Sequence, residues 1–319
     1  MESRGASRVL TRILVPPDGS SSAEQVIPYA RGLARRLGSR IDLIQVIEPA
    51  KAASGAPGSG RLRSDPNERL KAQAYVNEIA AGIREDNVFA EGFVHDGDPA
   101  AYLVSQASRG FATNLVAIAT RGRTGIDRVI KGSVSEKILQ GSMAPVLIVH
   151  TRRAGPPKSE VLFNKIYVPL DGSEASERVL PPVTAMARQL GIGITMLGVA
   201  DRPSDRFVPE SEKSRPSFKE HEYNDTAIGY FQSMVDILQR EGISPVDYRL
   251  LSGDPAGAIL ELINGEIPTT EAEEAKMESE NLLAIATHGR SGIRNSLAGS
   301  VTNRVIRNTR GPIMVVRAR

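Results

Sequence analysis

The residues best suited to chemistry lie in a basic, glycine-punctuated loop that the chain contains twice. Residues 115–139 read LVAIATRGRTGIDRVIKGSVSEKIL, and residues 282–306 read LLAIATHGRSGIRNSLAGSVTNRVI. Each copy is an apolar run, then the basic loop, then a Gly-Ser pair that opens a predicted helix. Backbone N–H groups at such a helix start can hold an anion. The pattern therefore predicts two phosphate-binding loops in one polypeptide.

A second duplicated motif supplies a carboxylate. The sequence Asp-Gly-Ser at residues 18–20 recurs at residues 171–173, each time after a short run of branched apolar residues. An aspartate in an Asp-Gly turn can also be a plain turn residue ahead of a helix. The duplication favours a functional role for Asp18 and Asp171 over that alternative.

A third duplicated motif is Gly-Asp-Pro, at residues 97–99 and 253–255. Aspartate followed by proline fits the N-cap and the first position of a helix. For Asp98 and Asp254 this structural interpretation is favoured over a binding role.

These landmarks follow the same order in both halves of the chain, which indicates a tandem duplication. Their spacing differs only through insertions, the larger of which falls within residues 264–280. A repeat of about 150 residues is a normal size for one hydrophobic core. We predict a first domain over residues 1–150, a linker over 151–164 and a second domain over 165–319.

The composition excludes several classes of protein. The 319 residues are 40% apolar and 24% charged, and no apolar run approaches the roughly 20 residues of a membrane helix. The N-terminal residues lack the apolar core of a signal peptide, so we expect a cytoplasmic protein without membrane contact. The absence of cysteine excludes disulfides and thiol catalysis. A net charge of +3 and 4% aromatic residues do not favour nucleic-acid binding.

Each half alternates short apolar strands with helices. In the first half, residues 26–37 have apolar side chains at the spacing of one helical face, and Gly38 is expected to end that helix, as Gly191 does in the second half. Nearly continuous apolar strands between helices are typical of a parallel sheet that is covered on both faces. We predict an α/β fold of two tandem doubly wound, Rossmann-like domains, each with a five-stranded parallel sheet of order 3-2-1-4-5 and helices on both faces.

In this order, the first and fourth strands flank the point where the winding reverses, and ligands bind beyond the carboxyl ends of such strands. Asp18 follows the first strand, and the glycine loop that contains Gly122 follows the fourth. The two motifs are therefore expected to meet at one crevice in each domain.

Over its whole length the chain resembles the universal stress protein family, as a tandem two-domain member. The loops are similar to those of the ATP-binding branch of that family, whose motif is Gly, two residues, Gly, nine residues and Gly-Ser or Gly-Thr. Gly122 and Gly289 are each followed by nine residues and a Gly-Ser pair. The first glycine of the motif is replaced by Ala119 in one copy and by Ala286 in the other.

The resemblance implies which positions bind the nucleotide. The aspartates would bond the ribose, the valines would line the adenine slot, the isoleucines would lie near the nucleoside, and the loop amides would hold the phosphates. Arg121 and His288 would face the phosphates or their metal ion. The first site would contain Asp18, Val46, Ile118, Ala119, Arg121, Gly122, Gly132, Ser133 and Val134, and the second Asp171, Val199, Ile285, Ala286, His288, Gly289, Gly299, Ser300 and Val301.

Some of these positions have a structural alternative. By composition alone, Val46 and Val199 would be core residues. Ser133 can cap its helix together with Glu136, but Ser300 has no such partner, and a phosphate contact is therefore favoured for both serines.

The chain lacks a general base that both sites share. Of its four histidines only His288 lies in a motif, and its counterpart Arg121 stays protonated. We therefore expect an ATP-binding stress-response regulator that carries Mg²⁺ or Mn²⁺ on the nucleotide and acts through nucleotide-dependent conformation, with slow ATP hydrolysis as a side activity. The alternatives are a nucleotide-free stress scaffold, which Ala119 and Ala286 favour, and a phosphotransfer or nucleotidyl-transfer enzyme.

The predicted partners follow from the same resemblance. The last strand of each half, at residues 146–149 and 313–316, would pair with the other to give an intramolecular pseudo-dimer, and whole chains would form homodimers. Nucleotide binding would order the variable loops at residues 48–68 and 201–222, and so change a surface that faces an unknown protein partner.

Overall fold

The structure is a computed structural model that divides into two compact units. It describes residues 10–48, 65–110, 113–120, 133–151, 157, 160–200, 218–265, 279–287 and 300–318. The first unit comprises residues 1–162, 268–280 and 314–317, and the second comprises residues 163–267, 281–313 and 318–319.

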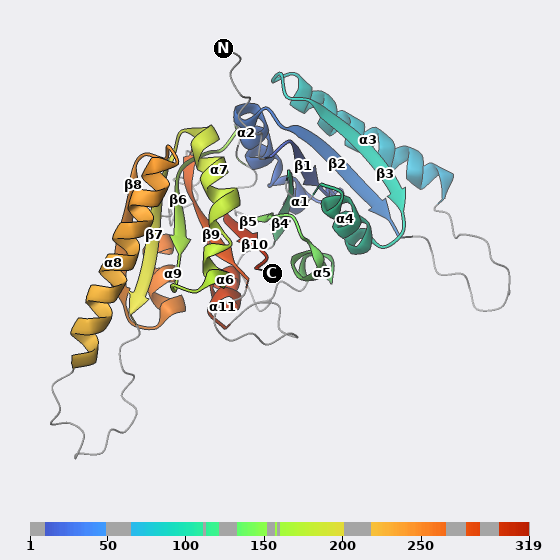
Figure 1. Cartoon of the computed structure of the whole chain (residues 1–319). Helices are drawn as coiled ribbons and strands as arrows, with labels where there is room; N and C mark the ends of the chain where they lie inside the picture. Colours follow the sequence, from blue (N-terminus) through green and yellow to red (C-terminus); the bar gives the residue numbers. More distant parts are fainter. Residues whose placement is uncertain are drawn as a thin grey trace, which may run out of the picture. The chain divides into compact units, whose positions relative to one another are not determined.

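The first unit alternates strands and helices, coloured blue to green in Figure 1. Its elements are β1 (Arg12–Val15), α1 (Ser21–Glu24), α2 (Ile27–Leu37), β2 (Arg40–Ile47), α3 (Pro66–Arg84), β3 (Ala90–Asp96), α4 (Pro99–Ser108), β4 (Asn114–Thr120), α5 (Ser133–Gly141) and β5 (Val146–His150). The strands run in the order β3-β2-β1-β4-β5, and each neighbouring pair is parallel. The predicted α/β fold with a parallel sheet is confirmed.

The second repeat, called the second unit from here on, follows the same plan in the yellow-green to red part of the chain, and it is counted here with its last strand at residues 313–316, most of which lies within the bounds given above for the first unit. Its elements are β6 (Leu162–Pro169), α6 (Glu174–Glu177), α7 (Leu180–Leu190), β7 (Gly193–Ala200), α8 (Phe218–Arg240), β8 (Val246–Ser252), α9 (Pro255–Gly265), β9 (Ser279–Ala286), α11 (Ser300–Asn308) and β10 (Ile313–Val316). The strand order is β8-β7-β6-β9-β10, and β7 is parallel to both β6 and β8.

Glycine ends the first long helix of each unit, as expected. Gly38 follows α2 with φ 63°, and Gly191 follows α7 with φ 66°. This left-handed conformation carries no Cβ penalty for glycine, which explains why the helices end there.

The structure corrects two details of the sequence prediction. Val26 is buried on the apolar face as expected, but it is the N-cap of α2 rather than an interior helical residue, because a proline in the first turn of α2 cannot donate the N–H that would continue the helix from α1. In addition, α3 begins at Pro66 and α8 at Phe218, so residues 66–68 and 218–222 are helical rather than loop.

The core of each unit lies between the sheet and the helices. Ile13, Leu14 and Val15 of the central strand β1 are fully buried, as are most residues of β4 and β5. With strands in the order β3-β2-β1-β4-β5, the right-handed crossovers that are usual between parallel strands would place α2 and α3 on one face of the first sheet and α4 and α5 on the other. Within the described residues, no helix is both long and apolar enough to cross a membrane.

Candidate functional site

Both Asp-Gly-Ser motifs form the same turn just beyond the first strand of their unit. The Oδ1 atom of Asp18 accepts a hydrogen bond from the backbone N–H of Ser20 at 2.9 Å, and Oδ1 of Asp171 accepts one from Ser173 N–H at 3.0 Å. Both aspartates are exposed to solvent. The turn role that the sequence offered as an alternative is therefore real in both units, and it holds each carboxylate at the carboxyl end of the central strand.

The serine of each turn begins the short helix that follows. Ser20 Oγ accepts the N–H of Ala23 at 3.1 Å, and Ser173 Oγ accepts the N–H of Ser176 at 3.2 Å. These contacts satisfy free donors at the helix starts, so the turns are fixed on both sides.

A tyrosine–glutamate pair connects each short helix to the long helix that covers the sheet. The hydroxyl of Tyr75 on α3 donates to Glu24 Oε1 at 2.7 Å, and the hydroxyl of Tyr230 on α8 donates to Glu177 Oε1 at 2.8 Å. The pair occurs at equivalent positions, and it ties α3 and α8 to the region of the aspartate turns.

Burial and the paired carboxylate both raise the pKa of these two tyrosines. For Tyr75 and Tyr230 the largest cause is burial, followed by the hydrogen bond to Glu24 or Glu177. The charge of Asp171 also raises the pKa of Tyr230. Both phenols therefore stay neutral near pH 7 and act as hydrogen-bond donors.

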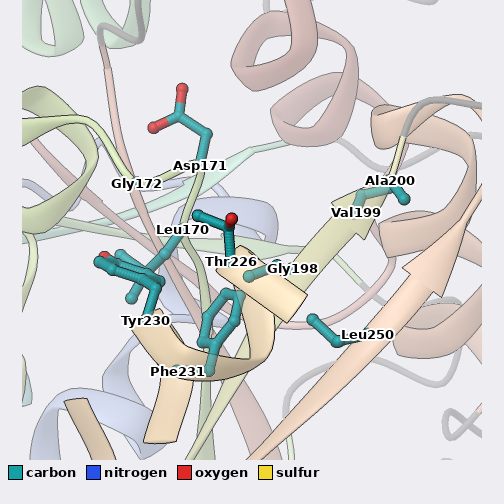
Figure 2. Close-up of a pocket in the computed structure, with 11 residues that line it drawn as sticks. Leu170, Asp171, Gly172, Gly198, Val199, Ala200, Thr226, Tyr230, Phe231 and Leu250 are labelled. Atoms are coloured by element: carbon teal, nitrogen blue, oxygen red, sulfur yellow. The ribbon is translucent and has the colours of Figure 1, made fainter. Parts of the chain in front are cut away.

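The second unit contains a cavity of about 220 Å³ at the carboxyl ends of β6 and β7, under α8. Figure 2 shows the Asp171 side chain above the other lining side chains, with the Phe231 ring at the bottom and Leu250 to its right. The lining residues are Leu170, Asp171, Gly172, Gly198, Val199, Ala200, Thr226, Ala227, Tyr230, Phe231 and Leu250. Two residues of the predicted second site, Asp171 and Val199, thus lie around one cavity.

The other positions of the predicted second site that the structure describes lie outside this lining. Ile285 and Ala286 are buried near the end of β9, and Ser300 and Val301 open α11. The hydroxyl of Thr302 donates to the carbonyl oxygen of Ala286 at 3.0 Å, which ties α11 to the end of that strand.

The equivalent positions of the first unit have the same places in the fold. Val46 lies in β2, Ile118 and Ala119 lie in β4, and Ser133 and Val134 open α5. Six predicted site residues lie outside the described residues, namely Arg121, Gly122, Gly132, His288, Gly289 and Gly299.

The two alanines that replace a motif glycine occupy ordinary strand positions. Ala119 is paired with Val149 of the parallel strand β5, and Ala286 is the last residue of β9. Neither has a positive φ. The backbone at these positions therefore does not require glycine.

A buried histidine lies beside the start of the first glycine loop. His150 ends β5, is 9% exposed, and its Nδ1 lies 3.2 Å from Thr120 Oγ1. Its Nε2 is buried and has no hydrogen-bond partner within the part of the chain that the structure describes. Burial lowers the pKa of His150 to about 4, so the imidazole is neutral at pH 7.

Asp98 and Asp254 are helix caps, as the sequence analysis favoured. Asp98 Oδ1 accepts the N–H of Ala101 at 2.8 Å, and Asp254 Oδ2 accepts the N–H of Gly257 at 2.8 Å. Each also forms an ion pair, with Lys137 and Arg304 respectively. Hydrogen bonding to Ala101 and then to Lys137 lowers the pKa of Asp98.

The tyrosine–glutamate pairs and most of the cavity wall were not predicted from the sequence. Glu24 recurs as Glu177 and Tyr75 recurs as Tyr230, so comparison of the two halves could have found them. Gly198 and Phe231 leave no such signal because the first half has other residues there. Among the described residues, no group of three or more His, Asp or Glu side chains could hold a metal ion.

Comparison with protein families assigns this architecture to one group. Residues 10–150 and 162–317 each match the universal stress protein family. The chain therefore belongs to that family, with two copies of its domain.

Individual relatives agree with this assignment. A universal stress protein of Mycolicibacterium smegmatis is 25% identical over 310 residues, which cover 96% of this chain and 97% of that protein. A universal stress protein of Methanocaldococcus jannaschii is 28% identical over 149 residues, or 46% of this chain and 85% of the relative. The crystal structure of a universal stress protein from Archaeoglobus fulgidus shares the fold, with a TM-score of 0.64, 21% identity and 96% of each chain covered.

Proposed function

We propose that the protein is an ATP-binding stress-response regulator with one adenine-nucleotide site in each of two domains, over residues 1–150 and 165–319. The observation that carries the proposal is the cavity that brings Asp171 and Val199 together at the carboxyl ends of β6 and β7. In a doubly wound sheet this is where ligands bind. The duplicated glycine loop follows the neighbouring strand and would place phosphate-binding amides beside it.

The size and chemistry of the cavity suit the base of a nucleotide. Its volume of about 220 Å³ is smaller than the roughly 300–1,000 Å³ of a pocket that encloses a whole drug-sized ligand. The base would occupy the apolar part near Phe231 and Leu250, with the ribose at the Asp171 carboxylate and the phosphates outside on the glycine loop. Mg²⁺ or Mn²⁺, when bound, would neutralise the phosphates.

Occupancy would act through conformation rather than chemistry. The cavity is bounded by α8, whose Tyr230 contacts Glu177 on the helix after the aspartate turn. A ligand that contacts α8 and Asp171 together would stabilise one arrangement of these elements. Location in the cytoplasm and assembly of whole chains into homodimers stay predictions.

Isothermal titration calorimetry with ATP and Mg²⁺ tests the proposal. We expect the intact chain to bind ATP. The double variant Asp18→Ala, Asp171→Ala should bind ATP at least tenfold more weakly, because each site loses the carboxylate that would accept a hydrogen bond from the ribose. The matched control is Asp98→Ala with Asp254→Ala, which removes two carboxylates that cap helices and should leave the affinity unchanged.

The same titration separates the alternatives. An intact chain that binds no ATP would reject the nucleotide site and favour a nucleotide-free scaffold of the same fold. ATP turnover on the order of 1 s⁻¹ or faster would instead place the protein in the usual range of enzymes.

A further inference from the structure

Three equivalent positions between the long helix and the sheet carry different residues in the two units. One position precedes Val46 or Val199 on the second strand, and another follows Tyr75 or Tyr230 on the long helix. The remaining position lies on the third strand. These positions hold Gln45, Val76 and Gly92 in the first unit and Gly198, Phe231 and Tyr248 in the second.

In the second unit, an aromatic cluster occupies this space. A Cβ atom added to Gly198 would lie 2.5 Å from Cε2 of Phe231, so only glycine leaves room for the ring where it stands. The Phe231 ring stacks on Tyr248, with centroids 5.5 Å apart, and meets Tyr230 edge-on at 5.0 Å. Gly198, Phe231 and Tyr230 all line the cavity (Figure 2).

In the first unit, helix and strand come into direct contact instead. A Cβ atom added to Gly92 would lie 2.7 Å from Cγ2 of Val76 and 2.9 Å from its backbone carbon, so α3 lies directly against β3. Gln45 occupies the position of Gly198, and its Oε1 atom is buried without a hydrogen-bond partner among the described residues. At this position a flat base would meet the amide of Gln45, and the ring of Phe231 has no counterpart because Val76 takes its place.

We infer that the two nucleotide sites are unequal, and that the second unit alone encloses the adenine base in an aromatic-walled cavity. The first unit would bind ATP mainly through its phosphates and ribose. The difference in base recognition is determined by three residues of the second unit, Gly198, Phe231 and Tyr248. Their counterparts in the first unit are Gln45, Val76 and Gly92. The inference rests on the proposed function and says which of its two sites recognises the base.

The physical reason is the difference in what a base gains on entry. Aromatic and apolar walls reward a flat ring through burial and stacking. A buried amide oxygen without a partner opposes the entry of apolar surface and accepts only a ring that donates to it in the right geometry. The second site should therefore favour ATP over a ligand that lacks a base, and the first should do so much less.

Titrations with two probes, ATP and inorganic tripolyphosphate, each with Mg²⁺, test the inference on single variants. We expect the intact chain to bind ATP at one tight and one weaker site, about tenfold apart, the size of one aromatic contact. Asp171→Ala should remove the tight site, and Asp18→Ala should leave it. The preference for ATP over tripolyphosphate should follow the tight site.

Residue exchange tests the assignment directly. Phe231→Val with Gly198→Gln brings the first unit's residues into the second, and should weaken the tight ATP site about tenfold while tripolyphosphate binds as before. Phe231→Val alone serves if circular dichroism shows that the double variant does not fold. Leu238→Val, a buried change on α8 outside the cavity lining, is the control and should leave both affinities unchanged.

Two sites of equal ATP affinity would overturn the inference and leave the proposed function standing. So would a tight site that Asp18→Ala removes and Asp171→Ala retains. An intact chain that binds no ATP would overturn the proposed function, and the inference with it.

Discussion

In the first unit the second strand of the sheet buries a charge, whereas the equivalent strand of the second unit buries a hydroxyl. Asp42 is fully buried and forms ion pairs with Arg12 and, at 3.2 Å, with Arg40. Thr195 takes the place of Asp42 in β7 and is also fully buried. The two units thus share a fold but differ in the buried polar residues of this strand. Substitutions near these residues should therefore affect the two units differently.

Around the candidate sites, the residue at the end of the last strand differs between the two halves, whereas the tyrosine–glutamate pairs are the same. The first unit ends β5 with the buried, neutral His150, where the second half of the sequence has the exposed Arg317. The tyrosine–glutamate pairs, Tyr75 with Glu24 and its counterpart, are the same in both units. Contacts that fix the aspartate turns are therefore retained, and side chains around the sheet ends differ.

The largest expected effect separates the units through the buried charge. Arg12→Ala should destabilise the first unit by about 3 kcal/mol, because it leaves Asp42 buried with Arg40 as its remaining ion-pair partner. Lys165 holds the matching position of β6, where it is paired with Gly193 of β7. Lys165→Ala should lower the stability of the second unit by less than about 1 kcal/mol, because Thr195 carries no charge.

Hydrogen exchange followed by mass spectrometry would measure this effect unit by unit. Faster exchange confined to β1 and β2 in Arg12→Ala is the expected result. Equal losses in the two variants would show that the buried charge does not distinguish the units.

The next effect is a pH dependence confined to the first unit. The pKa of His150 is lowered to about 4 in the folded state from its ordinary 6.5, so the unfolded chain binds its proton first as pH falls. Folding is favoured in full above pH 6.5, and about 2 kcal/mol of stability should be lost between pH 7 and pH 5.

Urea unfolding at the two pH values, compared between the native chain and His150→Gln, isolates this contribution. The variant should lose less stability on acidification because glutamine does not titrate. His95→Gln, a change of an exposed histidine on β3, is the control. A native chain and a His150→Gln variant with the same pH dependence would contradict the prediction.

The smallest expected effect is a loss of stability that should be equal in the two units. Tyr75→Phe and Tyr230→Phe each remove one hydrogen bond to a carboxylate, and each should cost about 1–2 kcal/mol. Thermal unfolding of the two variants measures the losses. A cost confined to one of them would mean that the pair is structural in that unit alone.

Much of the fold was readable from the chain itself. Alternating apolar strands and helices predicted the α/β class, and left-handed glycines at 38 and 191 end their helices as expected. The extra helix break at Val26 escaped prediction because the apolar spacing continues across it while a nearby proline interrupts the hydrogen bonds.

The candidate site was predictable only where the two halves agree. Asp171 and Val199 were found by duplication and resemblance, and they lie at one cavity. Phe231 and Gly198 were not found, because the ring of Phe231 fits between α8 and β7 only where residue 198 has no side chain. The sequence does not show that these two residues are in contact. Contacts of a nucleotide with any of these residues stay a prediction.

The sequence by itself determined the duplication, the family and the order of strands and helices, because these follow from local periodicity and from motifs that occur twice. Only the tertiary structure decided that Tyr75 meets Glu24, that His150 is buried, and that a cavity lies under α8. The physical reason is that periodicity fixes which face of a helix is buried, whereas its partner on the sheet depends on how closely the two backbones approach.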